Sequence, residues 1–197
     1  TLSLHDALPI SSLAVSATHG FVINMGNGTN AVNFNSGTVS LGFGNSTING
    51  GTGNDSVSIA GTSLTSAGSL ILALSDGNNT TNITTGTLNS GILQYTSGTG
   101  ADSFTILGTT ATLGTLNVNT GAGNDEVSLG GGSLTTTNSH GFTVNLGDGT
   151  NTLGFAGAVS LAGGISSVIG GTGSDTINIA VTTLGNLGTF SLALSDG

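Results

Sequence analysis

The chain has 197 residues, of which 36 are glycine, with one proline, no cysteine and no tryptophan. It contains no lysine or arginine but nine aspartate and glutamate residues, so its formal net charge is −9. Nucleic acids and anionic membranes are bound through cationic side chains, so neither is an expected partner, and metal cations or neutral glycan or protein surfaces are favoured instead. No apolar run of about 18 residues is present, so no membrane insertion is expected.

Residues 1–10 (TLSLHDALPI) differ from the rest of the chain. They hold the only proline and the only acidic residue that lies away from the glycine-rich turns. The DNA string ACTCTTTCCCTACACGACGCTCTTCCGATC encodes them, and this string is a common short-read sequencing adapter. We therefore expect residues 1–10 to be a non-native, adapter-derived leader. Residues 11–197 are then a single fragment, truncated at both ends, of metagenomic origin.

A glycine-centred hexad returns about every 24 residues, with steps between 23 and 26. The copies are MGNGTN (25–30), GGTGND (50–55), LSDGNN (74–79), SGTGAD (97–102), TGAGND (120–125), LGDGTN (146–151), GGTGSD (170–175) and a final LSDG (194–197). A fixed period of this size is typical of a solenoid, in which each repeat is one structural unit stacked on its neighbours.

Alternating polar and apolar residues follow each hexad, as in SVSIAG (56–61) and EVSLGG (126–131). Alternation at period two places Val57 and Ile59 on one face of a strand, and each strand is expected to pair in parallel with its copy about 4.8 Å away. The predicted fold is all-β, a parallel β-solenoid (β-helix) of about 24 residues per coil and about seven coils. An antiparallel β-sandwich or barrel array is the alternative, because the minor turns also fit a spacing of about 8–12 residues.

A longer repeat is superimposed on the coils. HGFVINMGNGTN (19–30) returns as HGFTVNLGDGTN (140–151), and GGTGNDSVSI (50–59) returns as GGTGSDTINI (170–179). Five coils thus form a unit of about 120 residues, and the second copy is incomplete. Duplicated units of this kind are typical of very long surface proteins, so flanking coils of the same larger protein are expected partners.

All acidic residues outside the leader lie in or beside the hexads, and we expect them to project from one edge as an acidic and amide ridge. GGTGNDSVS (50–58) and GGTGSDTIN (170–178) resemble the RTX nonapeptide GGxGxDxUx, a calcium-binding β-helix motif. SGTGADSFT (97–105) and TGAGNDEVS (120–128) lack only its first glycine. The resemblance implies calcium held by carboxylates and turn carbonyls. The candidate ligands are Asp55, Asp102, Asp125 and Asp175, in turns shaped by Gly53, Gly100, Gly123 and Gly173.

Here the nonapeptide occurs once per coil instead of in tandem, and Asn replaces Asp at positions such as Asn30 and Asn79. The alternative is an Asn/Asp ladder, in which these side chains satisfy backbone groups of the turns. Calcium is the one cofactor that the sequence suggests.

No catalytic constellation stands out. His19 and His140 occupy the same repeat position, and Glu126 and Asp125 point to opposite faces of a strand. Ice binding would require Thr at one position in successive coils. The aligned strand positions instead hold Ser58, Asn82, Thr105, Ser128 and Asn178.

The chain is similar to bacterial adhesins and autotransporter passengers. The similarity implies a structural and adhesive stalk segment of a large secreted or cell-surface bacterial protein, located outside the cell and without enzymatic activity. The alternative function is an RTX-type calcium-binding module for folding or export of a secreted hydrolase or toxin.

Overall fold

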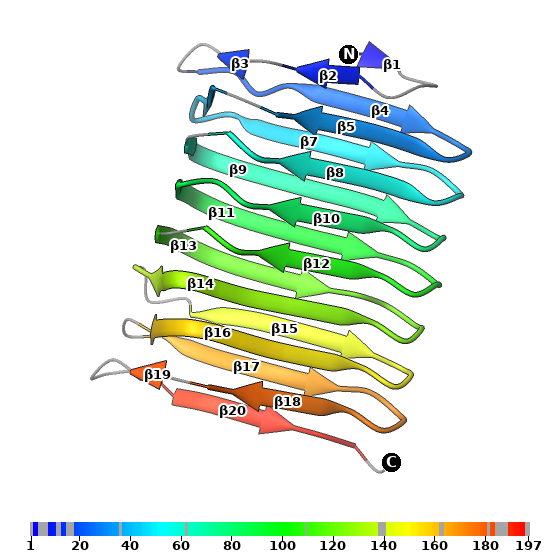
Figure 1. Ribbon diagram of the computed structural model, residues 1–197, viewed down its shortest axis with the longest axis vertical. Helices are drawn as coiled ribbons and strands as arrows, with labels where there is room; N and C mark the ends of the chain where they lie inside the picture. Colours follow the sequence, from blue (N-terminus) through cyan, green and yellow to red (C-terminus); the bar gives the residue numbers. More distant parts are fainter. Residues whose placement is uncertain are drawn as a thin grey trace.

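The computed structural model describes residues 2–3, 8–10, 13–14, 18–35, 37–61, 63–108, 110–137, 141–161, 164–180, 182–183 and 189–195. Over these residues the protein is all-β and has no helix. It forms a parallel β-solenoid of about six turns, with about 24 residues in each turn (Figure 1). The predicted architecture and repeat length are therefore confirmed, with about six turns where about seven were expected.

Each turn supplies three strand segments, which stack into three parallel columns along the rod (Figure 1). The first column follows the hexad and contains β2 (Leu8–Ile10), β5 (Asn30–Phe34), β8 (Asp55–Ile59), β10 (Thr80–Ile83), β12 (Ser103–Ile106), the first halves of β14 (Glu126–Thr136) and β16 (Thr152–Leu161), and β18 (Thr176–Ile179). The second column contains β3 (Leu13–Ala14), β6 (Thr38–Leu41), the first halves of β9 (Ser63–Ser75), β11 (Thr87–Ser97) and β13 (Thr110–Asn119), the second halves of β14 and β16, and β19 (Thr182–Thr183).

The third column leads into the next hexad. It contains β1 (Leu2–Ser3), β4 (Val22–Gly26), β7 (Asn45–Gly50), the second halves of β9, β11 and β13, then β15 (Phe142–Gly147), β17 (Ile165–Gly170) and β20 (Thr189–Ala193). The neighbouring strands within each column pair in parallel. The described residues therefore do not form the antiparallel sandwich or barrel that was the alternative.

The register of each column follows the hexad spacing. In the first column, Val57 pairs with Val32 on one side and with Thr81 on the other, and the series continues through Phe104, Val127, Leu153 and Ile177. Equivalent residues of successive repeats therefore lie directly above one another. This alignment places the apolar residues of every turn in one interior column.

The interior of the coil is a continuous hydrophobic core. Strand residues alternate between buried and half-buried positions, as the period-two pattern predicted. The largest side chains include Tyr95 and Phe104, whose stacked rings lie 4.6 Å apart between centroids. Burial of one such apolar side chain contributes about 1.5–3 kcal/mol to the free energy of folding. In a solenoid this burial is shared between adjacent turns, so each turn is stabilised mainly by contact with its two neighbours.

The fourth hexad position requires glycine. From Gly28 to Gly173 these glycines have φ angles between +103° and +150°, a region that L-residues rarely adopt. Gly53 has a φ of +124°, and a Cβ added there would collide with the backbone carbonyl of Gly28 in the preceding turn. Turn shape and close stacking of turns both explain why the motif recurs.

Among the described residues, no helix is long and apolar enough to cross a membrane.

Candidate functional site

The sixth residue of each hexad lies at the start of a first-column strand, with its side chain turned into the coil. We call this series the inner ladder, and it consists of Asn30, Asp55, Asn79, Asp102, Asp125, Asn151 and Asp175. The first six are at most 4% exposed, and Asp175 is half-buried. The four predicted ligands Asp55, Asp102, Asp125 and Asp175 therefore occupy equivalent rungs. The expectation that they project outward as a ridge is wrong, because the register places them inside the turn.

A chain of hydrogen bonds runs along the inner ladder from turn to turn. The backbone N–H of each rung donates to a side-chain Oδ1 of the next rung: Asn30 to Asp55 (3.2 Å), Asp55 to Asn79 (2.9 Å), Asn79 to Asp102 (2.8 Å), Asp102 to Asp125 (2.8 Å), Asp125 to Asn151 (2.9 Å) and Asn151 to Asp175 (3.2 Å). Asp and Asn offer the same acceptor here, which explains why both occur. The ladder interpretation of the sequence is confirmed by these contacts.

Each residue of the inner ladder, or rung, has a second polar side-chain atom besides Oδ1. In the Asn residues this atom is Nδ2, and it faces backbone carbonyl oxygens of the same turn. In Asn79, Nδ2 donates to the carbonyls of Ser75 (2.9 Å) and Gly77 (3.0 Å), four and two residues earlier. Asn30 makes the same pair of contacts with Gly26 and Gly28, each at 3.1 Å. This place in the turn therefore suits a hydrogen-bond donor.

Where the inner ladder has Asp instead of Asn, the carboxylate oxygen Oδ2 takes the place of the amide Nδ2. The Oδ2 atoms of Asp102 and Asp125 are buried and have no hydrogen-bond partner. The hydroxyls of Ser97 and Thr120 lie near these carboxylates, and each donates to a backbone carbonyl of the following turn, at 2.9 Å and 2.8 Å. Asp55 differs, since its Oδ2 accepts the backbone N–H of Gly51 at 3.2 Å.

Burial raises the pKa of Asp102 and of Asp125, and the backbone N–H groups that donate to them, together with the hydroxyls of Ser97 and Thr120, offset part of this shift. The phenol of Tyr95 is also buried without a partner. Burial raises the pKa of this phenol, the nearby hydroxyl of Ser97 offsets part of the rise, and the negative charges of Asp102 and Asp125 add to it. Three unpartnered oxygens therefore belong to one stretch of the core.

An unsatisfied buried polar group costs about 1–3 kcal/mol. A proton or a hard cation would relieve this cost for Asp102 and Asp125, which are the two carboxylates on adjacent rungs. Calcium prefers carboxylate and carbonyl oxygens, and this pair of turns offers both. Next to Asn30, Asn79 and Asn151 the amide group fills the equivalent place, so the fit to calcium is limited to the pair. Over the described residues, no three His, Cys, Asp or Glu side chains gather into a metal-binding group.

Two further ladders run along the outside of the hexad turns and were not predicted from the sequence. At the third position, Asp76 Oδ1 accepts the backbone N–H of Thr99 (2.9 Å), and Asp148 Oδ1 accepts that of Thr172 (2.9 Å). At the fifth position, Asn78 Oδ1 accepts the N–H of Ala101 (2.8 Å). Recurrence of Asn and Asp at these two hexad positions is the signal that could have revealed them.

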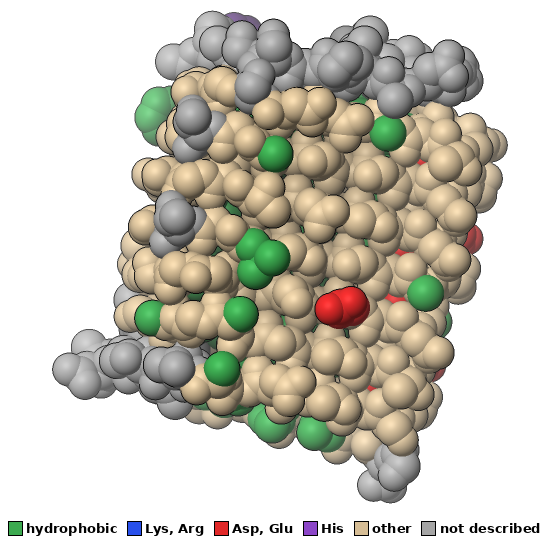
Figure 2. Space-filling view, viewed as in Figure 1, with side chains coloured by type: hydrophobic (Ala, Val, Ile, Leu, Met, Phe, Trp, Pro, Cys, Tyr) green, Lys and Arg blue, Asp and Glu red, His purple; other side chains and the backbone are tan. Residues whose placement is uncertain are grey.

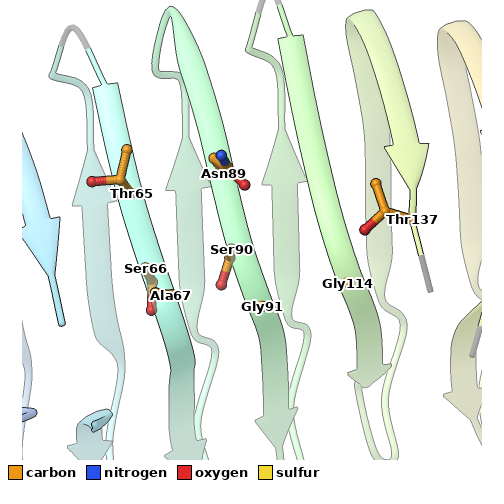
Figure 3. A pocket seen from close by; sticks show the side chains of 8 residues that line it. All are labelled: Thr65, Ser66, Ala67, Asn89, Ser90, Gly91, Gly114 and Thr137. Carbon is orange, nitrogen blue, oxygen red and sulfur yellow. The ribbon is translucent and has the colours of Figure 1, made fainter. Parts of the chain in front are cut away.

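One surface groove is lined only by small uncharged residues. The groove at the corner between the second and third columns is lined by Thr65, Ser66, Ala67, Asn89, Ser90, Gly91, Gly114 and Thr137 (Figure 3). No acidic residue or histidine lines it, and His19 is exposed beside Thr18. His140, Asp196 and Gly197 lie outside the described residues.

Comparison with known proteins gives no match of the chain to a protein-family model, to a curated protein or to a solved structure.

Proposed function

We propose that this chain is a structural and adhesive stalk segment of a large secreted or cell-surface bacterial protein. The observation that supports this function is the continuity of stacking, because core, turn glycines and inner ladder repeat in register from Asn30 to Asp175. Each turn contacts only its neighbours, so a rod of this kind can be lengthened by adding turns without a change of design.

The outer surface suits attachment to uncharged partners. Figure 2 shows a face covered mainly by uncharged polar side chains and backbone, with hydrophobic and acidic side chains few and dispersed. The chain has no lysine or arginine with which to hold an anionic surface. Neutral glycans and protein surfaces are the proposed partners, bound by many weak contacts along the rod.

Adhesion under flow tests this function. Beads carrying residues 11–197 are passed over surfaces coated with neutral glycans, with sulfated glycans or with anionic lipid, at low and at high salt. We expect retention on neutral glycans that does not fall with salt, because no charge pairing is involved. Absence of retention on every neutral surface, or retention that salt abolishes, contradicts the proposal.

A calcium-binding module is the second candidate function, and the buried Oδ2 atoms of Asp102 and Asp125 favour it. When bound, calcium would neutralise these carboxylates and fix the two turns against each other. Asp102 and Asp125 would hold it together with carbonyls of the same turns. The side chains of Asn79 and Asn151 would bound the site on either side, since their amide groups face turn carbonyls.

Tyr95 offers a direct readout of this site. It is the only tyrosine, and the chain has no tryptophan, so intrinsic fluorescence reports on one buried ring next to both carboxylates. In a calcium titration, a saturable fluorescence change that is lost in an Asp102→Asn/Asp125→Asn double variant supports the second candidate. An unchanged signal in the native chain rejects it.

A further inference from the structure

The groove at the corner between the second and third columns, which we call the corner groove, runs along the rod (Figure 3). Its lining comes from four successive turns, which contribute residues 65–67, residues 89–91, Gly114 and Thr137. Adjacent turns are about 4.8 Å apart, so the four turns extend over about 14 Å. The groove has a volume of about 350 Å³, within the range of ligand-binding sites. Its extension over several turns suits a linear chain better than a compact molecule.

Small residues give the corner groove a flat floor. Successive turns stack closely there, because a Cβ added to Gly91 would lie 2.8 Å from the carbonyl oxygens of both Ala67 and Gly68 in the preceding turn. Gly114 takes the same corner position in the following turn, and Ala67 contributes a single methyl group. A ligand chain can therefore lie against the backbone of three turns without meeting a large side chain.

An aromatic ring is exposed at one end of the corner groove. Phe43 lies at the same corner, one turn before Ala67, since the backbone N–H of Gly68 donates to the carbonyl of Gly42 at 3.2 Å. Its side chain is 73% exposed, whereas every other phenylalanine in the described part of the chain is buried or half-buried. The face of an aromatic ring is electron-rich and attracts the polarised C–H groups on the flat face of a sugar ring. Phe43 thus offers a stacking platform in line with the groove.

Two buried serines line the inner side of the corner groove. Ser66 and Ser90 occupy paired positions in adjacent turns and are 3% and 2% exposed. Ser90 Oγ donates to the carbonyl of Ile92 at 2.9 Å, whereas Ser66 Oγ has no hydrogen-bond partner. A polar ligand seated in the groove, or a water that it retains there, would give this oxygen a partner. Beside them Asn89 is exposed, and its amide makes no hydrogen bond with the described residues, so it is free to bind a ligand.

The charge distribution selects an uncharged ligand. No acidic residue lines the corner groove, and the acidic residues beyond residue 10 lie in or beside the hexads, at a different corner of the coil. The net charge of −9 repels anionic polymers, and the chain has no lysine or arginine to hold one. Uncharged hydrogen-bonding groups in line with an exposed aromatic ring are the chemistry that recognises a neutral sugar.

We propose that the corner groove binds a single chain of a neutral, ribbon-shaped polysaccharide of the β-1,4-linked class, aligned with the rod axis. One sugar ring stacks on Phe43, and the hydroxyl groups of the following rings bond to Asn89 and to the oxygen of Ser66. A coiled α-linked chain cannot follow the straight, flat floor that Gly91 and Gly114 provide. This inference rests on the proposed stalk function and adds the binding site and the class of glycan.

Isothermal titration of the full chain with soluble oligosaccharides tests the inference. The probes are hexamers of β-1,4-linked glucose and mannose, a hexamer of α-1,4-linked glucose, and an anionic oligogalacturonate. The variants are Phe43→Ala and Ser66→Ala, with Leu107→Ala as the matched control, because Leu107 is also an exposed apolar residue (45%) but lies between the first and second columns. Circular dichroism and thermal melts verify that the variants are folded, and Asn89→Ala replaces Phe43→Ala if that variant is not.

We expect the native chain and Leu107→Ala to bind a β-1,4-linked hexamer with equal affinity, and Phe43→Ala to bind about tenfold more weakly. Ser66→Ala should also weaken binding, but its melting temperature should be unchanged or higher, because no protein group satisfies the hydroxyl that is removed. A purely structural role of Ser66 would give the opposite pattern, a lower melting temperature at unchanged affinity, and would contradict the inference.

Equal affinity of the native chain and Phe43→Ala overturns the inference, as does preferential binding of the α-linked or the anionic oligomer. The flow assay separates this result from failure of the stalk function. Retention of both groove variants on neutral glycans at the native level overturns the corner groove alone, whereas absence of retention of the native chain on every neutral surface contradicts both proposals.

Discussion

Replacement of the two adjacent buried carboxylates by amides is expected to stabilise the protein at neutral pH. Asp102→Asn and Asp125→Asn keep the Oδ1 acceptor that each rung offers to the preceding turn. Each also exchanges an unpartnered Oδ2 for an NH₂ group, in the place where Asn79 donates to two turn carbonyls. The expected sign is unusual, because most changes of a buried polar residue destabilise.

The magnitude follows from the contacts of one rung. Removal of an unsatisfied buried acceptor recovers about 1–3 kcal/mol, and each new hydrogen bond adds about 0.5–1.5 kcal/mol. Retaining only the first contribution, each variant gains about 1–3 kcal/mol. For a chain of about 150–250 residues, the melting temperature should rise by about 2–4 °C for each kcal/mol.

The gain should depend on pH. Because burial raises the pKa of Asp102 and Asp125 in the folded state, the folded protein binds protons more tightly than the unfolded chain does. Their protonated forms stabilise the fold fully below the unfolded pKa of an aspartate, and this stabilisation is lost as pH rises through the raised folded values. The native chain should therefore lose stability with rising pH over that window, and the double variant should lose less.

Urea and thermal melts in EGTA, at acidic and at neutral pH, measure both effects. Asp55→Asn is the matched control on the same ladder, because Asp55 accepts hydrogen bonds at both carboxylate oxygens from Asn30 and Gly51. An amide there would turn its NH₂ group towards a donor, so this variant should lose stability. The reasoning is refuted if Asp102→Asn and Asp125→Asn destabilise at neutral pH in EGTA, or if Asp55→Asn stabilises as they do.

Three other substitutions test the core and the turns. Gly53→Ala should lower the free energy of unfolding by more than about 1 kcal/mol, the usual size of a glycine-to-alanine difference. The reason is that φ is +124° and the added Cβ would collide with the Gly28 carbonyl, and urea unfolding measures the loss. Phe104→Ala should cost about 3–5 kcal/mol by opening a cavity beside Tyr95, seen as a lower urea midpoint, and an unchanged midpoint would contradict the packing. Tyr95→Phe should be neutral or stabilising in thermal melts, because the hydroxyl it removes is buried without a partner; a large loss would reveal a contact of that hydroxyl.

The repeat pattern was enough to predict the solenoid. Glycine at the fourth hexad position gives the period, and alternation around Val57 and Phe104 gives strands whose copies pair in parallel. The inward orientation of the inner ladder side chains was not predicted, because a polar residue next to a glycine turn is usually expected to be exposed to solvent. Only the register shows that Asp102 caps a backbone N–H of the preceding turn.

The second column was harder to predict than the first. Hexads mark the first column clearly, but long strands such as β14 pass through the corner, so the sequence shows no boundary between the first and second columns. The alignment of Thr87 with Thr110 becomes visible once the strands are paired.

Far-UV circular dichroism of residues 11–197, with thermal melts in excess EGTA and then in millimolar calcium, tests the central claim most directly. The claim is that stacking of the core and the hydrogen bonds of the inner ladder hold the rod together without a metal. We expect the same strand signal and the same melting temperature in both conditions. A strand signal that appears only with calcium would contradict the claim and would make the chain a calcium-dependent module.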